Sequence, residues 1–254
     1  MAFATAPAAN PAWRLRLLDT WQLAQNGRHI NVPWRQQRLI AVLALQGQRP
    51  RTHVAGVLWP ESNETRAMSS LRAAIWQVQQ CLPGLLLEGR GPLGLRPDVR
   101  VDVHDLLSCV TGNGPTGTSS NTDADAGHAL TLLTHGDLLP GWYDDWVLFE
   151  RERLQQLRLR ALEGLADRLL GAGEVDLALA AALAAVAIEP FRESAHRALI
   201  RVHLALGNYV DALRVYDGFR QRLLQELGIP PSPQITTLVA NLLGRPRAAQ
   251  GKRS

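Results

Sequence analysis

The clearest hydrophobic pattern in the chain lies between Thr65 and Leu82. The apolar side chains of Leu71, Ile75, Val78 and Leu82 are spaced four, three and four residues apart, which places them on one face of a helix. The opposite face is polar, so the pattern predicts an amphipathic helix over 65–82 that lies on a core. An ordinary solvated surface helix would show the same spacing. The neighbouring segments must therefore decide whether the polar face of this helix has a binding role.

Short strands and two helices are predicted before this segment. Trp13 and Leu15 alternate with arginines, and Asn26-Gly27 is typical of a hairpin turn, because a type I′ turn needs positive φ at both central residues. Periodic apolar positions then predict a helix over 35–46 and a short one over 53–60. The order of elements indicates a helix-turn-helix, with 65–82 as the helix that enters a DNA groove.

A glycine-bearing hairpin is predicted directly after that helix, followed by an extended run around 99–103. Gly89, Gly91 and Gly94 allow tight turning, and Arg90 falls at the predicted tip. A wing would touch a DNA phosphate at this point. The alternative for Arg90 is an ordinary solvated turn residue.

The second half of the chain is predicted to be helical. Residues 111–127 have almost no apolar content and predict a flexible insertion between two helices, and 128–243 shows helical periodicity throughout. Glycine recurs at 173 and 207 and alanine at 178 and 212, a period of 34 residues that is typical of tetratricopeptide (TPR) repeats. Residues 244–254 are predicted to be a disordered basic tail.

Composition limits the function further. The chain has 254 residues, of which 46% are hydrophobic, so it can bury a core, but no apolar run is long enough for a membrane span. We find no secretory signal and therefore expect a cytoplasmic protein. Two cysteines make neither a disulfide framework nor a metal cluster, and the histidines are scattered with no HExxH or G-x-S-x-G motif. We expect no enzyme activity, no metal and no cofactor.

Charge is distributed unevenly along the chain. Residues 1–110 hold 12 arginines against 7 acidic residues, a net charge of +5, whereas 137–243 hold 11 against 14, a net charge of −3. A basic first half fits contact with a polyanion, and an acidic second half fits contact with protein.

A resemblance to a known family rests on motifs in the second half. They are Leu139-Pro-Gly, Trp146, the ERERL run at 150–154, Pro190 with Glu193 and His196-Arg197, then Gly207, Ala212, Tyr216 and LQELGIPPSP at 224–233. In this order they resemble the bacterial transcriptional activator domain of the antibiotic regulatory proteins, the SARP transcription factors. The first half resembles their response-regulator-type winged helix.

The resemblance implies both a fold and a function. The fold is mainly α, with a winged helix-turn-helix over 12–101 and an all-α TPR-like domain over 102–243. The implied function is that of a cytoplasmic activator that binds repeated elements of double-stranded promoter DNA as a homodimer and recruits RNA polymerase. The chain has no GxxxxGK stretch for a nucleotide, so it looks like a small, stand-alone member.

The predicted DNA contacts lie on the polar face of helix 65–82 and at the wing tip. They are Arg66, Ser69, Arg72, Ala73, Trp76, Gln77, Gln80 and Arg90. Family members usually carry several arginines in the C-terminal half of this helix, where the present chain has Trp76-Gln-Val-Gln-Gln. Glutamine can read adenine edges but neutralises no phosphate. The alternative function is therefore a TPR-like interaction adaptor with a weakened or lost DNA-binding helix.

Overall fold

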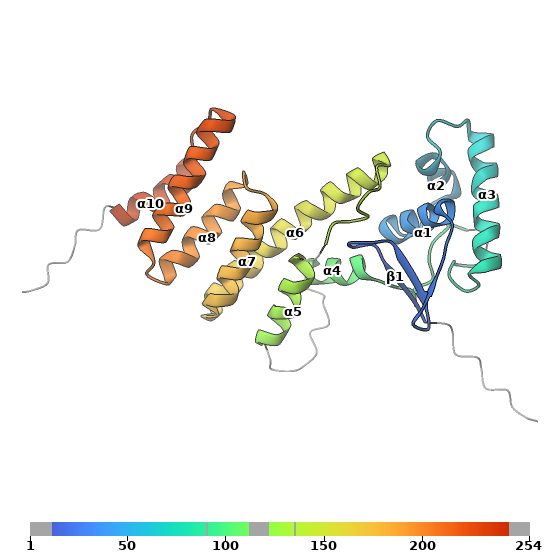
Figure 1. Ribbon diagram of the computed structural model, residues 1–254, viewed down its shortest axis with the longest axis horizontal. Helices are drawn as coiled ribbons and strands as arrows, with labels where there is room; N and C mark the ends of the chain where they lie inside the picture. Colours follow the sequence, from blue (N-terminus) through green and yellow to red (C-terminus); the bar gives the residue numbers. More distant parts are fainter. Residues whose placement is uncertain (1–11, 90, 112–121, 135, 244–254) are drawn as a thin grey trace, which may run out of the picture. The chain divides into compact units, whose positions relative to one another are not determined.

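A computed structural model describes residues 12–89, 91–111, 122–134 and 136–243 (Figure 1). Its contacts divide the chain into two compact units. Unit 1 comprises Met1–Ser108 and His135–Arg153, and unit 2 comprises Cys109–Thr134 and Leu154–Ser254.

Unit 1 opens with a small sheet. Its strands are β1 (Trp13–Arg16), β2 (Gln22–Gln25), β3 (Arg28–Ile30) and β4 (Arg100–Val101), in the order β3-β2-β1-β4. Strands β1, β2 and β3 pair antiparallel, and the turn between β2 and β3 has φ of 50° at Asn26 and 81° at Gly27. These angles confirm the predicted hairpin, because asparagine and glycine tolerate positive φ best.

Three helices follow the sheet in unit 1. They are α1 (Trp34–Gln46), α2 (Arg51–Leu58) and α3 (Glu64–Cys81), and α3 packs on both α1 and α2. The structure thus confirms the fold predicted for the first half, including the helix across 65–82. Helix α1 ends where Gly47 turns to a φ of 71° and its N–H donates to the carbonyl of Leu43.

The extended run predicted around 99–103 forms a shorter strand than expected, and this strand pairs with β1 and not with the hairpin before it. Arg100 and Val101 pair parallel with β1, and helix α4 (Asp102–Thr111) begins at the next residue. The Asp102 carboxylate explains the early start, since it accepts the N–H groups of Leu17, Leu18 and its neighbour Val103. The hairpin itself is short, with one bridge between Leu86 and Leu95.

The loop predicted over 111–127 is also shorter than expected. Helix α5 (Thr122–Thr134) includes the sequence TDADAG, which was predicted to belong to the loop. Its alanines favour helix strongly enough for the helix to begin at Thr122. Residues 112–121 and the predicted tail 244–254 lie outside the described residues.

A later segment of the chain, 136–153, packs with the winged-helix elements inside unit 1. The N–H of Leu139 donates to the carbonyl of Leu17 at 2.8 Å, and the rings of Trp34 and Trp142 lie 4.2 Å apart. Arg38 of α1 forms an ion pair with Asp144. The domain boundary between 101 and 102 stays a prediction, because these contacts define a compact unit and not a functional domain.

Unit 2 contains only helices among its described residues. Helix α6 (Asp145–Ala172) begins in unit 1 and ends in unit 2, and α7 (Val175–Ile188), α8 (Glu193–Ala205) and α9 (Tyr209–Arg222) follow it. A π-helical turn, η1 (Leu223–Leu227), leads to α10 (Pro233–Leu243). Consecutive helices pack, α7 on α8 and α8 on α9, which is the arrangement expected for TPR-like repeats.

The 34-residue period has a physical basis in this unit. Gly173 and Gly207 each end a helix with positive φ, at 85° and 73°. The next residue in each repeat, Glu174 or Asn208, donates its N–H to a carbonyl five residues earlier. Glycine recurs because this cap needs a left-handed residue. Ala178 and Ala212 are fully buried, as the predicted close helix packing requires.

His196 lies in the core of unit 2, stacked on Phe219 with ring centroids 4.2 Å apart. Its Nε2 donates to the carbonyl of Pro190 at 3.0 Å, and its buried Nδ1 has no partner among the described residues. Burial lowers the pKa of His196 below its usual value, and the charge of Arg222 lowers it further. The hydrogen bond to the carbonyl of Pro190 raises the pKa, but by less than burial lowers it. The fold therefore disfavours protonation of this histidine.

A pH dependence follows from His196. Between pH 7.5 and 5.5 the unfolded chain takes up a proton at this residue while the folded chain resists it, so the free energy of unfolding should fall as the pH falls. His196→Gln keeps an N–H donor for Pro190 but cannot be protonated, so its stability should fall less. Urea unfolding followed by far-UV circular dichroism at both pH values measures the difference. An equal fall in both proteins would contradict the assignment.

Candidate nucleic-acid interface

Helix α3 begins at a well-formed cap. Oδ1 of Asn63 accepts the N–H of Arg66 at 2.9 Å, which satisfies one of the free donors of the first turn. Glu64 adds a negative charge in that turn, where the helix dipole favours it. The start of the helix is therefore fixed by sequence, and the faces of the helix follow from it.

The apolar side chains of α3 form one buried face. Leu71, Ala74 and Val78 are completely buried, and Ala67 and Ile75 are nearly so. Leu82, the C-terminal cap, is also buried. The four apolar positions predicted to point inward do so.

The opposite face of α3 is exposed and carries the predicted DNA contacts. Arg66, Ser69, Arg72, Ala73, Trp76, Gln77 and Gln80 are all exposed. Oγ of Ser69 donates to the carbonyl of Thr65 at 2.9 Å, and Arg72 donates to that Oγ at 3.2 Å. The structure thus brings these seven residues onto one surface. Arg90 lies outside the described residues.

Gln77 has a partner that the sequence did not reveal. Gln36 of α1, only 7% exposed, donates from its Nε2 to Oε1 of Gln77. Reading adenine bidentately needs both the amide oxygen and the amide nitrogen of a glutamine. The bond to Gln36 occupies one of the two lone pairs of the Gln77 amide oxygen and restrains the orientation of its amide, whereas Gln80 is exposed and forms no such bond among the described residues.

Trp76 is the most unusual residue of this face. Its side chain is 62% exposed, so it is not packed into the core or held against the described part of the wing hairpin. An exposed tryptophan on a groove-facing surface can contact thymine methyl groups or sugars. Arg66 and Arg72 precede it on the helix and supply the positive charge of this face.

Three arginines were missed as candidates from the sequence. Arg51 at the start of α2 donates to the carbonyl of Gly89 at 2.9 Å, so it supports the wing hairpin beside its predicted tip. Arg14 and Arg100 come together on the outer face of the sheet because β1 pairs with β4. The alternation along β1 indicated an exposed Arg14, but the parallel register that brings Arg100 beside it had no signal.

Comparison with known families decides what kind of protein carries this interface. The family described as the bacterial transcriptional activator domain matches residues 116–243, which is 128 of 254 residues. The chain belongs to the SARP-type transcriptional activators. This is a family of transcriptional regulators and not of enzymes.

Curated SARP-type relatives match most of the chain. The regulatory protein AfsR of Streptomyces coelicolor is 28% identical over 222 residues, covering 82% of this chain and 22% of AfsR. The regulatory protein AfsR of Streptomyces griseus is 26% identical over 253 residues, covering 93% of this chain and 25% of that protein. The chain thus spans about a quarter of the length of these relatives.

A solved structure shares the fold. Mycobacterium tuberculosis EmbR, solved in complex with a low affinity phosphopeptide, matches with a TM-score of 0.69 at 19% identity, covering 92% of this chain and 65% of EmbR. This likeness confirms the fold expected of SARP-type activators, in which the first half contains helices and strands and the second half is helical. In the described part of the chain, no helix combines the length and apolar character that crossing a bilayer requires.

The cap of α3 gives a stability prediction for this interface. Asn63→Ala should lower the free energy of unfolding of unit 1 by about 1 kcal/mol, because the N–H of Arg66 loses its acceptor. Ser62→Ala is the matched control, since no hydrogen bond of its side chain is found among the described residues. All seven tryptophans lie in unit 1, so urea unfolding followed by tryptophan fluorescence reports on this unit. Equal losses in both variants would contradict the cap.

Proposed function

We propose that this regulator activates transcription by binding promoter DNA through the exposed face of α3. The observation that carries the proposal is the division of α3 into a buried apolar face and an exposed face with Arg66, Arg72, Trp76 and Gln80. A helix that presents its polar side chains from a helix-turn-helix suits the major groove of B-DNA.

Roles within the interface follow from side-chain chemistry. Arg66 and Arg72 are expected to contact phosphates at the groove edges, which positions the helix without reading sequence. Gln80 is the best candidate for bidentate reading of adenine, and Trp76 for contact with thymine methyl groups. Ser69 and Ala73 are small enough to let the helix approach the bases closely.

The family resemblance supports the wider parts of the proposal. Binding to repeated elements as a homodimer and recruitment of RNA polymerase are properties of SARP-type activators, and unit 2 offers a TPR-like surface for protein contact. Within unit 2, residues 154–243 hold nine arginines and nine acidic residues, so they have no excess positive charge to attract DNA.

Arg72 provides the test of DNA contact. The affinity of the full chain for promoter DNA should fall with salt, and Arg72→Gln should weaken binding to all sequences and reduce the slope of log K against log salt by about one. Arg220→Gln, which removes an exposed arginine of unit 2, is the matched control and should leave the slope unchanged. Fluorescence anisotropy over a salt series measures both.

Two outcomes would contradict the proposal. If Arg72→Gln and Arg220→Gln changed the slope equally, α3 would not be the phosphate-contacting element. If the full chain showed no affinity for any DNA at low salt, the activator proposal would fall, and the interaction-adaptor function would take its place.

A further inference from the structure

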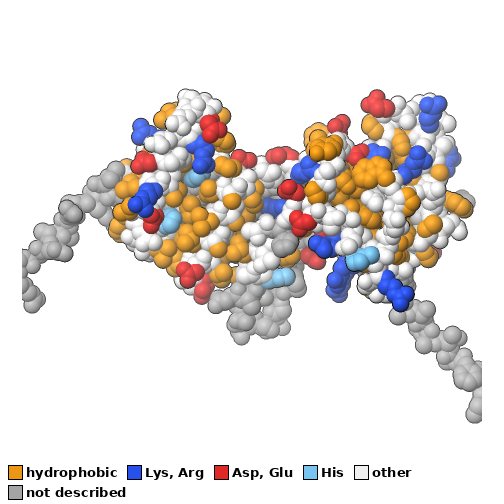
Figure 2. Space-filling model, viewed as in Figure 1, with side chains coloured by type: hydrophobic (Ala, Val, Ile, Leu, Met, Phe, Trp, Pro, Cys, Tyr) orange, Lys and Arg blue, Asp and Glu red, His pale blue; other side chains and the backbone are white. Residues whose placement is uncertain are grey.

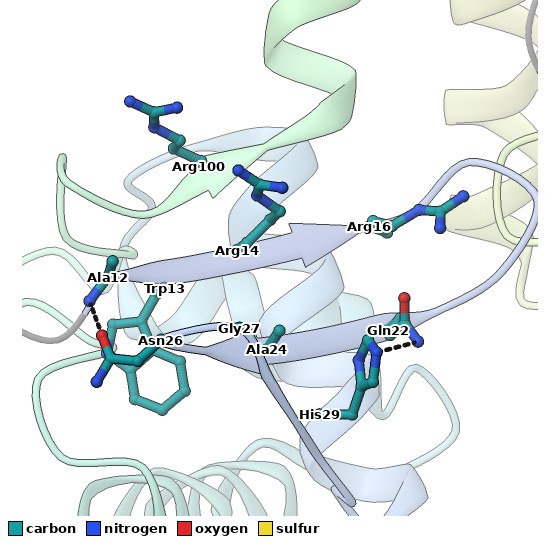
Figure 3. A pocket seen from close by; sticks show the side chains of 10 residues that line it. All are labelled: Ala12, Trp13, Arg14, Arg16, Gln22, Ala24, Asn26, Gly27, His29 and Arg100. Carbon is teal, nitrogen blue, oxygen red and sulfur yellow. Dashed lines mark hydrogen bonds between the residues drawn. The ribbon is translucent and has the colours of Figure 1, made fainter.

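The outer face of the sheet in unit 1 forms a shallow hollow, away from α3. Its lining side chains come from all four strands (Figure 3) and include Arg14, Arg16, Gln22, Ala24, His29 and Arg100. No acidic residue lines it within the described part of the chain. Figure 2 shows basic side chains along the part of unit 1 that holds this sheet.

Two arginines of the hollow stand directly opposite each other. Arg14 of β1 is in register with Arg100 of β4, and Figure 3 shows both side chains on the same side of the sheet. Like charges opposite each other on neighbouring strands destabilise a sheet. Neither guanidinium has an ion-pair or hydrogen-bond partner among the described residues. An anion between them would turn this repulsion into attraction.

The carboxylate of Asp102, which interacts with Arg16 of the hollow, is already hydrogen-bonded to backbone N–H groups. The donors are the N–H groups of Leu17, Leu18 and Val103. These bonds fix Asp102 at the end of β1, on the side of Arg16. Among the residues that the structure describes, none forms an ion pair with Arg14 or Arg100.

The shape and the other donors of the hollow suit a small ligand. Ala24 stands opposite Arg14 on β2, and its short side chain leaves the centre of the face open. The hollow has a volume of about 580 Å³, within the range of sites for small molecules. His29 and Gln22 hydrogen-bond each other at 3.4 Å on its far side and can supply further donors.

We propose that this hollow binds a small oxyanion with two or more negative charges, either a phosphate compound or a polycarboxylate. The forks of Arg14 and Arg100 match both kinds of oxyanion bidentately. Duplex DNA is a poorer occupant, because none of the lining residues belongs to α3 and the hollow has the size of a small-molecule site.

Isothermal titration of the full chain at low ionic strength tests the site, with pyrophosphate and citrate as separate probes. We expect at least one probe to bind with a stoichiometry of one, and Arg14→Gln and Arg100→Gln each to weaken it about tenfold or more. Arg28→Gln is the matched control: it removes an exposed arginine of the same sheet that does not line the hollow. Binding of pyrophosphate alone identifies a phosphate ligand, and binding of citrate alone identifies a carboxylate ligand.

Thermal unfolding without either probe is the second readout. Arg14→Gln and Arg100→Gln should be at least as stable as the wild type, since each removes the repulsion, and the wild type should gain more from the bound probe than either variant. The proposal is overturned if neither probe binds, or if Arg28→Gln weakens binding as much as Arg14→Gln. It is also overturned if the Arg14 and Arg100 variants lose DNA affinity as Arg72→Gln does, because the face would then belong to DNA.

Discussion

The buried face of α3 is the constraint on which the interface depends. Leu71, Ala74 and Val78 have no exposed surface, so the helix cannot rotate about its axis without exposing them. Truncating one large apolar side chain in such a face costs about 2–5 kcal/mol, a large share of the stability of a domain. Because a helix has a fixed period, burying these residues also decides which ones point outward. Arg72, Trp76 and Gln80 are presented to solvent for that reason.

Segment 136–153 shows that the family domain and the compact unit do not coincide. The family match covers 116–243, yet this part of it packs in unit 1 through Leu139, Trp142 and Asp144. Within the segment, Arg151 donates to the carbonyls of Leu138 and Leu139 and holds the turn before α6 in place. Part of the activator domain therefore stabilises the same unit that carries α3. A change in this segment would reach the winged-helix elements through the contacts of Leu139, Trp142 and Asp144.

Local patterns predicted the elements well, whereas contacts between distant residues could not be predicted. Helix α3 and the Asn26-Gly27 turn depend on neighbouring residues, so period and turn chemistry were enough to place them. The parallel pairing of Arg100 with β1 and the bond between Gln36 and Gln77 join residues far apart in sequence. No spacing rule indicates such pairs. The outward set of α3 was predictable, but the hydrogen bond that Gln77 accepts from Gln36 was not.

Selection of DNA from a random duplex pool tests the central claim most directly, because the operator does not have to be known beforehand. The full chain should enrich a repeated motif, and Gln80→Ala should lose the preference at one or two positions of each repeat while keeping the others. Gln80 is the informative residue because it is exposed and, unlike Gln77, forms no bond to Gln36. Enrichment of the same motif by both proteins would show that Gln80 does not read bases, and no enrichment by the wild type would contradict sequence-specific binding by α3.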